Sequence, residues 1–243
     1  YKLNPNDKNE VIETAYSYSK LCSRNGDVIV EEFMDGEEIS VETLSIDGKC
    51  HIIQITDKLT TGTPHFVEMG HSQPTHHSQE MVAKINKITN EANYAVGIKN
   101  GPSHTEIIIT KEGPKIVELG ARLGGDCITT HLVPLSTGVD MVKCCIEIAL
   151  GETPDIRSKW NKGAAIRYFK QHAGVVNSIE GIDVAKRMVG VNQISIIHNV
   201  GEKITEIDSS GSRLGFVIAN GENANSAIKI CEEVLDMINI EIK

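Results

Sequence analysis

Two glutamates stand in segments whose other residues favour β-strands. Glu106 lies in "TEIIIT" and Glu118 in "PKIVELG", and "KEG" joins the two, with Gly113 at its third position. Pairing of Thr110 with Pro114 would close a three-residue hairpin loop. The hairpin would then place the two glutamates opposite each other, with Cβ atoms about 5 Å apart. Like charges in this position destabilise a sheet unless a cation lies between them or one carboxyl is protonated. Mg²⁺ favours such oxygen ligands, together with substrate phosphates.

The spacing alone leaves two other interpretations open. An exposed hairpin face would leave both glutamates solvated. A four-residue loop "KEGP" would put them on opposite faces, a register that Pro114 favours because it lacks an N–H. The residues that follow, "ELGARLGGD", indicate phosphoryl chemistry. Arg122 comes four residues after Glu118, where a guanidinium can meet phosphate oxygens, and Gly124 and Gly125 allow close approach of a ligand to the backbone.

Both helices and strands are needed to position these residues. Apolar residues at three- and four-residue spacing predict helices over 8–25, 78–94, 138–151 and 223–238. β-rich runs predict strands at 27–33, 39–46, 49–59, 164–169, 193–198 and 214–221. The segment "MDGEE" is interpreted as a turn, and residues 60–77 as a long loop. The pattern predicts an α+β protein with a first domain over 1–155 and an appended α+β subdomain over 156–243.

The composition argues against two classes of partner. The chain has 33 acidic and 24 basic residues and a net charge of -9, and a negative charge disfavours binding to nucleic-acid phosphates. It has no apolar run near the roughly 20 residues that a membrane-spanning helix needs, and no signal peptide. Six cysteines without CxxC spacing predict reduced thiols in a cytoplasmic protein.

The segments "VIVEEFMDGEEISVE", "HTEIII" and "KIVELGARLGGD" resemble the C-terminal half of the ATP-grasp ligases. Within these ligases the resemblance is to the group of L-amino-acid ligases, biotin carboxylase-type enzymes and purine-pathway carboxylate–amine ligases, and it covers about residues 1–243. It implies an antiparallel sheet with flanking helices and a small C-terminal subdomain. It also implies an enzyme that phosphorylates a carboxylate with ATP and Mg²⁺, or Mn²⁺, and couples the acyl phosphate to an amine.

The resemblance assigns ATP-binding roles to residues in the first half of the chain. Glu31 and the main chain of Phe33 and Met34 would bind adenine, and Glu38 would hold the ribose hydroxyls. Without the resemblance, a solvated acidic turn on an edge strand is the favoured interpretation of Glu31, Glu32, Glu37 and Glu38. Lys58 is near enough in sequence to reach phosphate.

The resemblance also implies metal and catalytic roles. Glu106 and Glu118 would bind Mg²⁺, and Arg122 would stabilise the charge that develops on the transferred phosphoryl group. Related enzymes often carry Asn two residues after the second glutamate, where this chain has Gly120.

The loop "PHFVEMGHSQP" falls where related enzymes shape the acceptor site, which implies substrate contacts for His65, Glu68 and His71. Gly124 and Gly125 would lie against the same substrate. We expect His76 and His77 to be solvent-exposed loop residues.

Two residues keep alternative interpretations. His104 would line the substrate pocket or serve as a hydrogen-bonded core residue. Arg213 would line the edge of the active site, although an exposed turn arginine is the expectation favoured by its "SSGS" context.

The chain has no glycine-rich phosphate loop such as G-x-x-x-x-G-K-[ST]. In the family this loop and its lysines precede the helix that here begins near Lys8. The resemblance therefore implies that this chain is the C-terminal portion of a larger ligase and that the N-terminal part of the same enzyme completes the site. Dimers are common among such enzymes, so the resemblance also allows a homodimer. The alternatives are a non-catalytic nucleotide-binding or assembly domain, and a purine-pathway or carbamoyl-phosphate type of enzyme.

Overall fold

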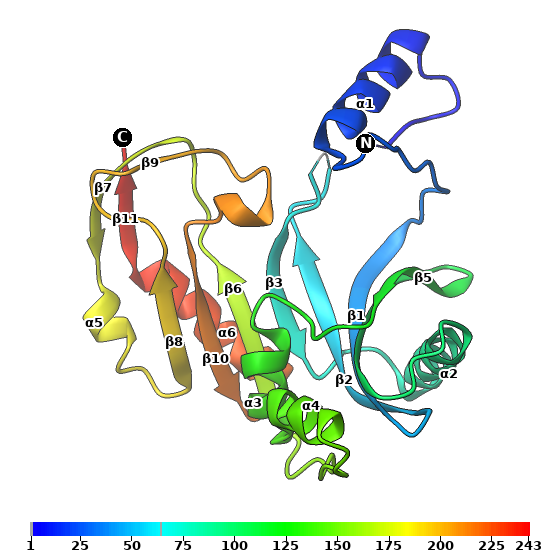
Figure 1. The fold of residues 1–243 in the computed structure, drawn as a ribbon. Helices are drawn as coiled ribbons and strands as arrows, with labels where there is room; N and C mark the ends of the chain where they lie inside the picture. Colours follow the sequence, from blue (N-terminus) through cyan, green and yellow to red (C-terminus); the bar gives the residue numbers. More distant parts are fainter. Residues whose placement is uncertain (1, 64) are drawn as a thin grey trace.

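The computed structural model describes residues 2–63 and 65–243 (Figure 1). The central element of these residues is a sheet of eight strands, in the order β5-β4-β1-β2-β3-β6-β10-β8. The strands of this sheet are β1 (Gly36–Ile46), β2 (Lys49–Thr60), β3 (Glu68–Gln73), β4 (Gly101–Thr110), β5 (Gly113–Gly120), β6 (Gly163–Tyr168), β8 (Val191–Ile196) and β10 (Gly215–Gly221). Each pair of neighbouring strands is antiparallel. A second, three-stranded sheet contains β7 (Gly174–Glu180), β9 (Lys203–Ile204) and β11 (Asn239–Ile242).

Six α-helices occur among the described residues. They are α1 (Asn9–Cys22), α2 (Gln79–Ala95), α3 (Val133–Thr137), α4 (Met141–Ala149), α5 (Ile182–Ala185) and α6 (Ala224–Met237), with a π-helical turn η1 (Ile128–Leu132) and a 3₁₀ turn η2 (Ser210–Ser212). Ile85 of α2 packs on Ile39 and Ile107 of β1 and β4 in one apolar core. Cys231 of α6 packs in another core with β6 and β10. In Figure 1, α1 lies beside the N-terminus and projects away from the sheet.

The observed elements confirm the α+β class with an antiparallel sheet and flanking helices. The helices expected over 8–25, 78–94, 138–151 and 223–238 are present as α1, α2, α4 and α6. The sheet joins the two expected domains, because β3 pairs with β6. The boundary near residue 155 falls between α4 and β6 and stays a prediction.

The strand expected at 27–33 and the turn expected at 34–38 are wrong. Residues 27–35 form no strand, and β1 begins at Gly36, inside the expected turn. Ile29 and Val30 are 77% and 86% exposed, so their side chains gain no burial that would stabilise a strand here. β-propensity records packing against neighbours rather than an intrinsic backbone preference.

The long loop expected at 60–77 contains a strand. β3 has the sequence "EMGHSQ", which lacks apolar alternation, yet its last four residues are buried. Pairing with β2 on one side and β6 on the other forces the strand conformation on this polar segment. Of the described residues, none belongs to a helix with both the length and the apolar character needed to cross a membrane.

Candidate functional site

Three carboxylates from three strands surround the ammonium of Lys58. Its Nζ lies 2.7 Å from Oε1 of Glu38 on β1 and 2.8 Å from Oε1 of Glu106 on β4. Oε1 of Glu68 on β3 is 3.8 Å away. Burial alone would lower the pKa of Lys58, but the carboxylates of Glu38 and Glu106 outweigh it and raise that pKa. We call these four residues the Lys58 cluster.

Strand pairing explains why the Lys58 cluster forms. Glu106 pairs with Ser40, two residues from Glu38, so both glutamates point to the same face. Lys58 pairs with His71 on β3, which brings Glu68 to the same end of the sheet. Lys58 itself has only 2% of its side chain exposed. Its charge is therefore fixed among the carboxylates rather than in solvent.

Glu106 and Glu118 pair directly across β4 and β5, as the sequence predicts, but by another route. Thr110 pairs with Gly113, which gives a two-residue loop instead of the expected three-residue one. The register then shifts between Glu106 and Ile107, and this β-bulge restores the pairing of the glutamates.

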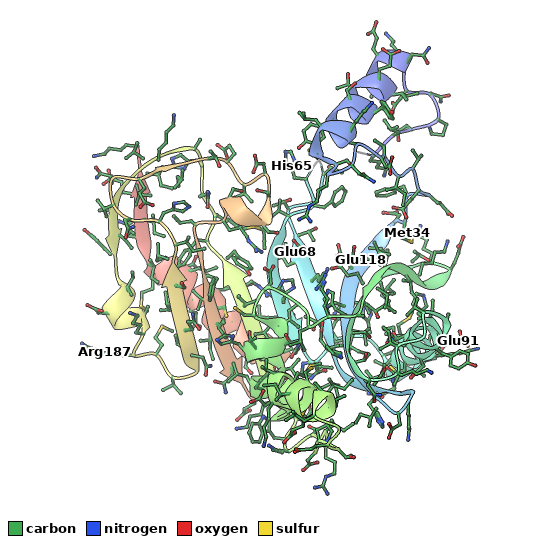
Figure 2. The ribbon with its side chains drawn as sticks, in the orientation of Figure 1. Met34, His65, Glu68, Glu91, Glu118 and Arg187 are labelled. Carbon is green, nitrogen blue, oxygen red and sulfur yellow. The ribbon has the colours of Figure 1, made fainter. Side chains whose placement is uncertain are left out.

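Glu118 and Arg122 lie at the exposed edge of the site. Their side chains are 57% and 51% exposed, and Nη2 of Arg122 lies 3.5 Å from Oε1 of Glu118. In Figure 2, Glu118 and Glu68 appear toward the same end of the large sheet. The structure thus groups Glu106 with Glu38 and Glu68 within 4.8 Å, with Glu118 outside that group.

A buried histidine connects Glu106 to the interior. Nε2 of His104 lies 3.2 Å from Oε1 of Glu106, and its Nδ1 lies 2.7 Å from Oε1 of Glu42. Glu42 is completely buried, and its Oε1 also accepts a hydrogen bond from the Ser40 hydroxyl. Burial opposes protonation of His104, but the hydrogen bonds with Glu106 and Glu42 raise its pKa to about 9. The hydrogen bond from His104, reinforced by Lys58, lowers the pKa of Glu106 to about 2.

These shifts predict a pH-dependent stability. The folded-state pKa of His104 is raised, so its contribution to the free energy of unfolding is fully present below about pH 6.5. It is lost as the pH rises toward about 9. At about 1.4 kcal/mol per pKa unit, the loss is at most roughly 3 kcal/mol. Glu106 has a lowered pKa, so it affects stability at acidic pH instead. Its contribution to the free energy of unfolding is lost as the pH falls from about 4.5 toward 2.

Urea denaturation of the metal-free protein between pH 6 and 9 measures this effect. We expect His104→Gln to remove the alkaline decrease in stability, with His198→Gln as the control at a partly exposed histidine outside the site. An equal alkaline decrease in the wild type and in His104→Gln would contradict the assignment.

Gly124 lies directly against the Glu42–His104 pair. A Cβ on Gly124 would lie 2.7 Å from Oε2 of Glu42 and 2.8 Å from Nδ1 of His104. The glycine is therefore required by packing inside the protein, in addition to any role toward substrate. A Cβ on the neighbouring Gly125 would have no atom within 4 Å.

The two glycines make a matched pair for mutagenesis. We expect Gly124→Ala to lower the free energy of unfolding by about 1–3 kcal/mol, because the added methyl displaces a buried charged pair. Gly125→Ala should change it by less than about 0.5 kcal/mol. Chemical denaturation of both variants tests this, and equal stabilities would show that the Gly124 contact is not tight.

A second ionic group joins distant parts of the chain. Asp126 receives both Nη atoms of Arg213, at 2.7 and 2.8 Å, and Nε2 of His71 at 3.1 Å. Arg213 also donates to the Glu68 carbonyl at 3.0 Å and lies 3.8 Å over the ring of Tyr168. Burial would raise the pKa of Asp126, but the hydrogen bonds from His71 and Arg213 hold it well below its usual range. We call Asp126, His71 and Arg213 the Asp126 clamp.

The Asp126 clamp corrects the expectation for Arg213. Its side chain is only 7% exposed, so the interpretation as a solvent-exposed turn arginine is wrong. The ion pair with Asp126, 87 residues away, draws it into the protein. The backbone of Asp126 is itself left-handed, with φ of 48°, which is uncommon for a non-glycine residue. The side chains of His71 and Arg213 therefore hold Asp126 in a sparsely populated conformation.

Two cavities adjoin these groups. A cavity of about 170 Å³ is lined by residues of the Lys58 cluster and the Asp126 clamp, together with His104, Arg122, Gly125 and Ser210. A larger cavity, of about 1050 Å³, is lined by the segment 28–39, by α1 residues and by Lys58. Glu31, Phe33, Met34 and Glu38 all line the larger cavity. Lys58 lines both, so it marks where they meet.

The three remaining histidines with predicted positions differ in their exposure to solvent. His65 is exposed, and it is not among the residues that line these two cavities. His76 is exposed as expected, but His77 has only 12% of its side chain exposed, so the expectation for His77 is wrong. His77 directly precedes Ser78, the N-cap of α2, and its ring centroid lies 4.3 Å from that of His76.

Sequence reasoning missed two residues of the site, Glu42 and Asp126. A carboxylate inside the β-rich run "ISVETLSI" is the signal that would have identified Glu42, because an acid in a buried strand needs a partner. Asp126 follows the two glycines of "RLGGD", but its partner Arg213 comes from the far end of the chain.

Family models match both halves of the chain. Residues 6–130 match the ATP-grasp domain, and residues 167–243 match the L-amino acid ligase C-terminal domain 2. The chain therefore belongs to the ATP-grasp family.

Its relatives include enzymes named as ligases. The chain is 27% identical over 236 residues to the phosphoribosylamine–glycine ligase of Methanococcus maripaludis, covering 89% of this chain and 52% of that protein. It is 20% identical over 230 residues to the L-arginine-specific L-amino acid ligase of Bacillus subtilis, covering 92% and 55%. The solved L-amino acid ligase of Bacillus licheniformis superposes with a TM-score of 0.84 at 26% identity, over 98% of this chain and 60% of that one. The chain thus spans about half the length of the curated relatives that it matches.

Proposed function

We propose that this chain forms part of an ATP-dependent ligase that phosphorylates a carboxylate and couples the resulting acyl phosphate to an amine. The observation that carries the proposal is the Lys58 cluster, in which a buried ammonium and three carboxylates lie where the two cavities meet. Membership of the ATP-grasp family and the ligase names of the relatives support the same reaction class.

In this proposal the larger cavity takes the nucleotide. Phe33 and Met34 offer main-chain groups to the adenine edge, and Glu31 contributes a carboxylate beside them. Glu38 is the acceptor for the ribose hydroxyls. A cavity of about 1050 Å³ leaves room for a nucleotide and its phosphates, and the N-terminal part of the same enzyme would close it.

The donor set suits Mg²⁺ or Mn²⁺. Glu106 and Glu118 pair across two strands and offer only oxygen, and Glu38, Glu68 and Glu106 offer oxygens within 4.8 Å of one another. Hard divalent cations favour such ligands. When bound, the cation supplies charge neutralisation at the ATP phosphates. Gly120 gives no side-chain ligand, so Glu106 and Glu118 are the protein ligands that we assign.

The chain's own cations then serve the phosphoryl group. Lys58 lies in both cavities and is the donor that we assign to the transferred phosphate. Arg122, with half of its side chain exposed, is free to turn from Glu118 toward the charge that develops in the transition state. His104 keeps Glu106 ionised and oriented through its buried partner Glu42.

The smaller cavity is the acceptor site in this proposal. Glu68 and Asp126 provide carboxylates that attract an amine or ammonium group, and His71 orients Asp126. Gly125 leaves open space for the substrate backbone, whereas the Glu42 carboxylate occupies the space next to Gly124. An amino acid fits both requirements, because it carries a carboxylate for activation and an amine for recognition.

A purine-pathway ligase is the second candidate. The 27% identity with a phosphoribosylamine–glycine ligase favours it. The match of residues 167–243 to the L-amino acid ligase C-terminal domain 2 favours an amino-acid substrate instead. For this reason we rank an amino-acid substrate first.

Oxygen-isotope transfer tests the proposed reaction. The full polypeptide that carries this chain is supplied with ATP, an amine mixture and amino acids labelled with ¹⁸O in the carboxylate. An acyl phosphate transfers one ¹⁸O from the carboxylate to the released phosphate. Phosphate release without label in the phosphate would contradict carboxylate activation, and label transfer with glycine and phosphoribosylamine alone would favour the second candidate.

A further inference from the structure

Two histidines and a glutamate form a cluster that the proposed ligase chemistry does not use. Nε2 of His76 lies 3.2 Å from Oε2 of Glu37, and Nε2 of His77 lies 3.6 Å from the same oxygen. One ligand atom from each of the three residues lies within 4.8 Å of the other two. In a tetrahedral Zn²⁺ site with bonds of about 2.0–2.1 Å, neighbouring ligand atoms lie about 3.3 Å apart. The two measured distances bracket that spacing.

Strand alternation separates this cluster from the Lys58 cluster. Ile39 pairs with Asp57, so Glu37 and Asp57 point to one face of the sheet. Glu38 and Lys58 point to the other face. Because α2 packs over Ile39, the histidine cluster lies on the α2 face, and the carboxylates of the proposed nucleotide site lie on the opposite one.

Asp57 fixes the orientation of the His76 ring. Nδ1 of His76 lies 2.8 Å from Oδ2 of Asp57, and the same oxygen accepts the His76 backbone N–H at 2.9 Å. The hydroxyl of Thr75 donates to the other carboxylate oxygen. With Nδ1–H donating to Asp57, the lone pair of Nε2 points toward Glu37. Histidines that ligate metals usually have such a carboxylate on the second ring nitrogen.

His77 supplies an independent observation. Its Nε2 is buried and has no hydrogen-bond partner among the residues that the structure describes. The 3.6 Å separation from Glu37 is too long for a hydrogen bond. A buried polar atom without a partner costs free energy. A cation between His77 and Glu37 would satisfy this atom.

We propose that Glu37, His76 and His77 bind a transition-metal cation of the Zn²⁺ type, with a water or a ligand group at the fourth position. Two imidazoles and one carboxylate suit Zn²⁺ rather than Mg²⁺, which prefers oxygen ligands. The cation would link the start of β1 to the segment that leads into α2. Glu37 and His76 line the larger cavity together with Glu38 and Lys58, so this cavity reaches both faces of the sheet and gives access to the fourth position.

Zinc calorimetry on the full polypeptide that carries this chain tests the site. We expect one Zn²⁺ per chain, and a weaker affinity in His77→Ala and in Glu37→Gln, on the order of 100-fold for each. Asp57→Asn, which alters the partner of the His76 ring without removing a proposed metal ligand, should weaken binding by about 10- to 100-fold. Co²⁺ absorption in the visible region reports whether the ligands are arranged tetrahedrally.

Two controls keep the test specific. His198 lies 3.1 Å from Glu202 in an exposed pair, so His198→Ala measures adventitious binding to surface histidines and should leave the affinity unchanged. Glu106→Gln should also leave it unchanged, because Glu106 belongs to the opposite face. Absence of saturable binding, equal loss in His198→Ala, or loss in Glu106→Gln would each overturn the proposal. Circular dichroism verifies that the variants remain folded.

Discussion

Replacing Glu106 with glutamine should lower the rate of ATP-dependent phosphate release by about 10³-fold or more. Glu106 is the one carboxylate in the site that contacts Lys58, contacts His104 and pairs across strands with Glu118. The amide keeps the volume but removes the charge, so a metal ligand and the partner of two cations are lost together. Phosphate release by the full polypeptide, measured with saturating substrates, gives the effect on turnover.

Glu112→Gln is the matched control for this prediction. Glu112 lies in the loop of the same hairpin, and its carboxylate contacts Lys115 at 2.6 Å on the surface. Removal of this exposed ion pair should change stability little and leave turnover unaltered. If Glu106→Gln and Glu112→Gln had the same activity, the Lys58 cluster would not be the centre of phosphoryl transfer.

Replacing Arg213 with methionine should lower the free energy of unfolding by about 3 kcal/mol. Arg213 is 7% exposed, and its guanidinium makes a bidentate pair with Asp126. Methionine fills part of the space over Tyr168, but it leaves the buried side of Asp126 without its main cation. Denaturant unfolding measures the loss, and Arg187→Met is the control, because Arg187 is exposed at the far edge of the molecule (Figure 2).

A double-mutant cycle separates the ion pair from simple packing. Asp126→Asn combined with Arg213→Met should be less destabilised than the sum of the two single variants, because neither charge is then left buried alone. Arg213→Lys should restore little stability, since an ammonium cannot make both hydrogen bonds. Strict additivity of the two single effects would show that Asp126 and Arg213 are not energetically coupled.

The pairing of Glu106 with Glu118 is predictable from the sequence, but the turn and the register shift that produce it are not. The spacing and the loop "KEG" predict the hairpin, but the actual turn has two residues and a bulge restores the register. Bulges depend on twist and on neighbouring strands, and these have no local signature. The right pairing therefore came from a wrong turn and a missed bulge that compensated each other.

The misplaced elements have a common physical cause. Residues 27–33 have high β-propensity but find no partner strand among the described residues, whereas the polar run of β3 lies between two strands and is buried. In both cases tertiary pairing overrides local preference. Periodicity was more reliable for α2 and α6, because each of these helices buries one apolar stripe.

The candidate site shows the same limit. Glu106, Glu118 and Arg122 lie within one short segment, so their spacing identifies them. The Asp126 clamp joins positions 87 residues apart, and Lys58 meets Glu106 only because β1 lies between their strands. Such partners require the sheet order, which a single sequence does not supply.

Calorimetric titration of the full polypeptide with ATP, in the presence and absence of Mg²⁺, determines whether the Lys58 cluster belongs to a nucleotide and metal site. We expect saturable binding that requires Mg²⁺, that is abolished in Glu106→Gln and that is retained in Glu112→Gln. Equal affinity for ATP and Mg²⁺ in the wild type and in Glu106→Gln would contradict a nucleotide and metal site at the Lys58 cluster.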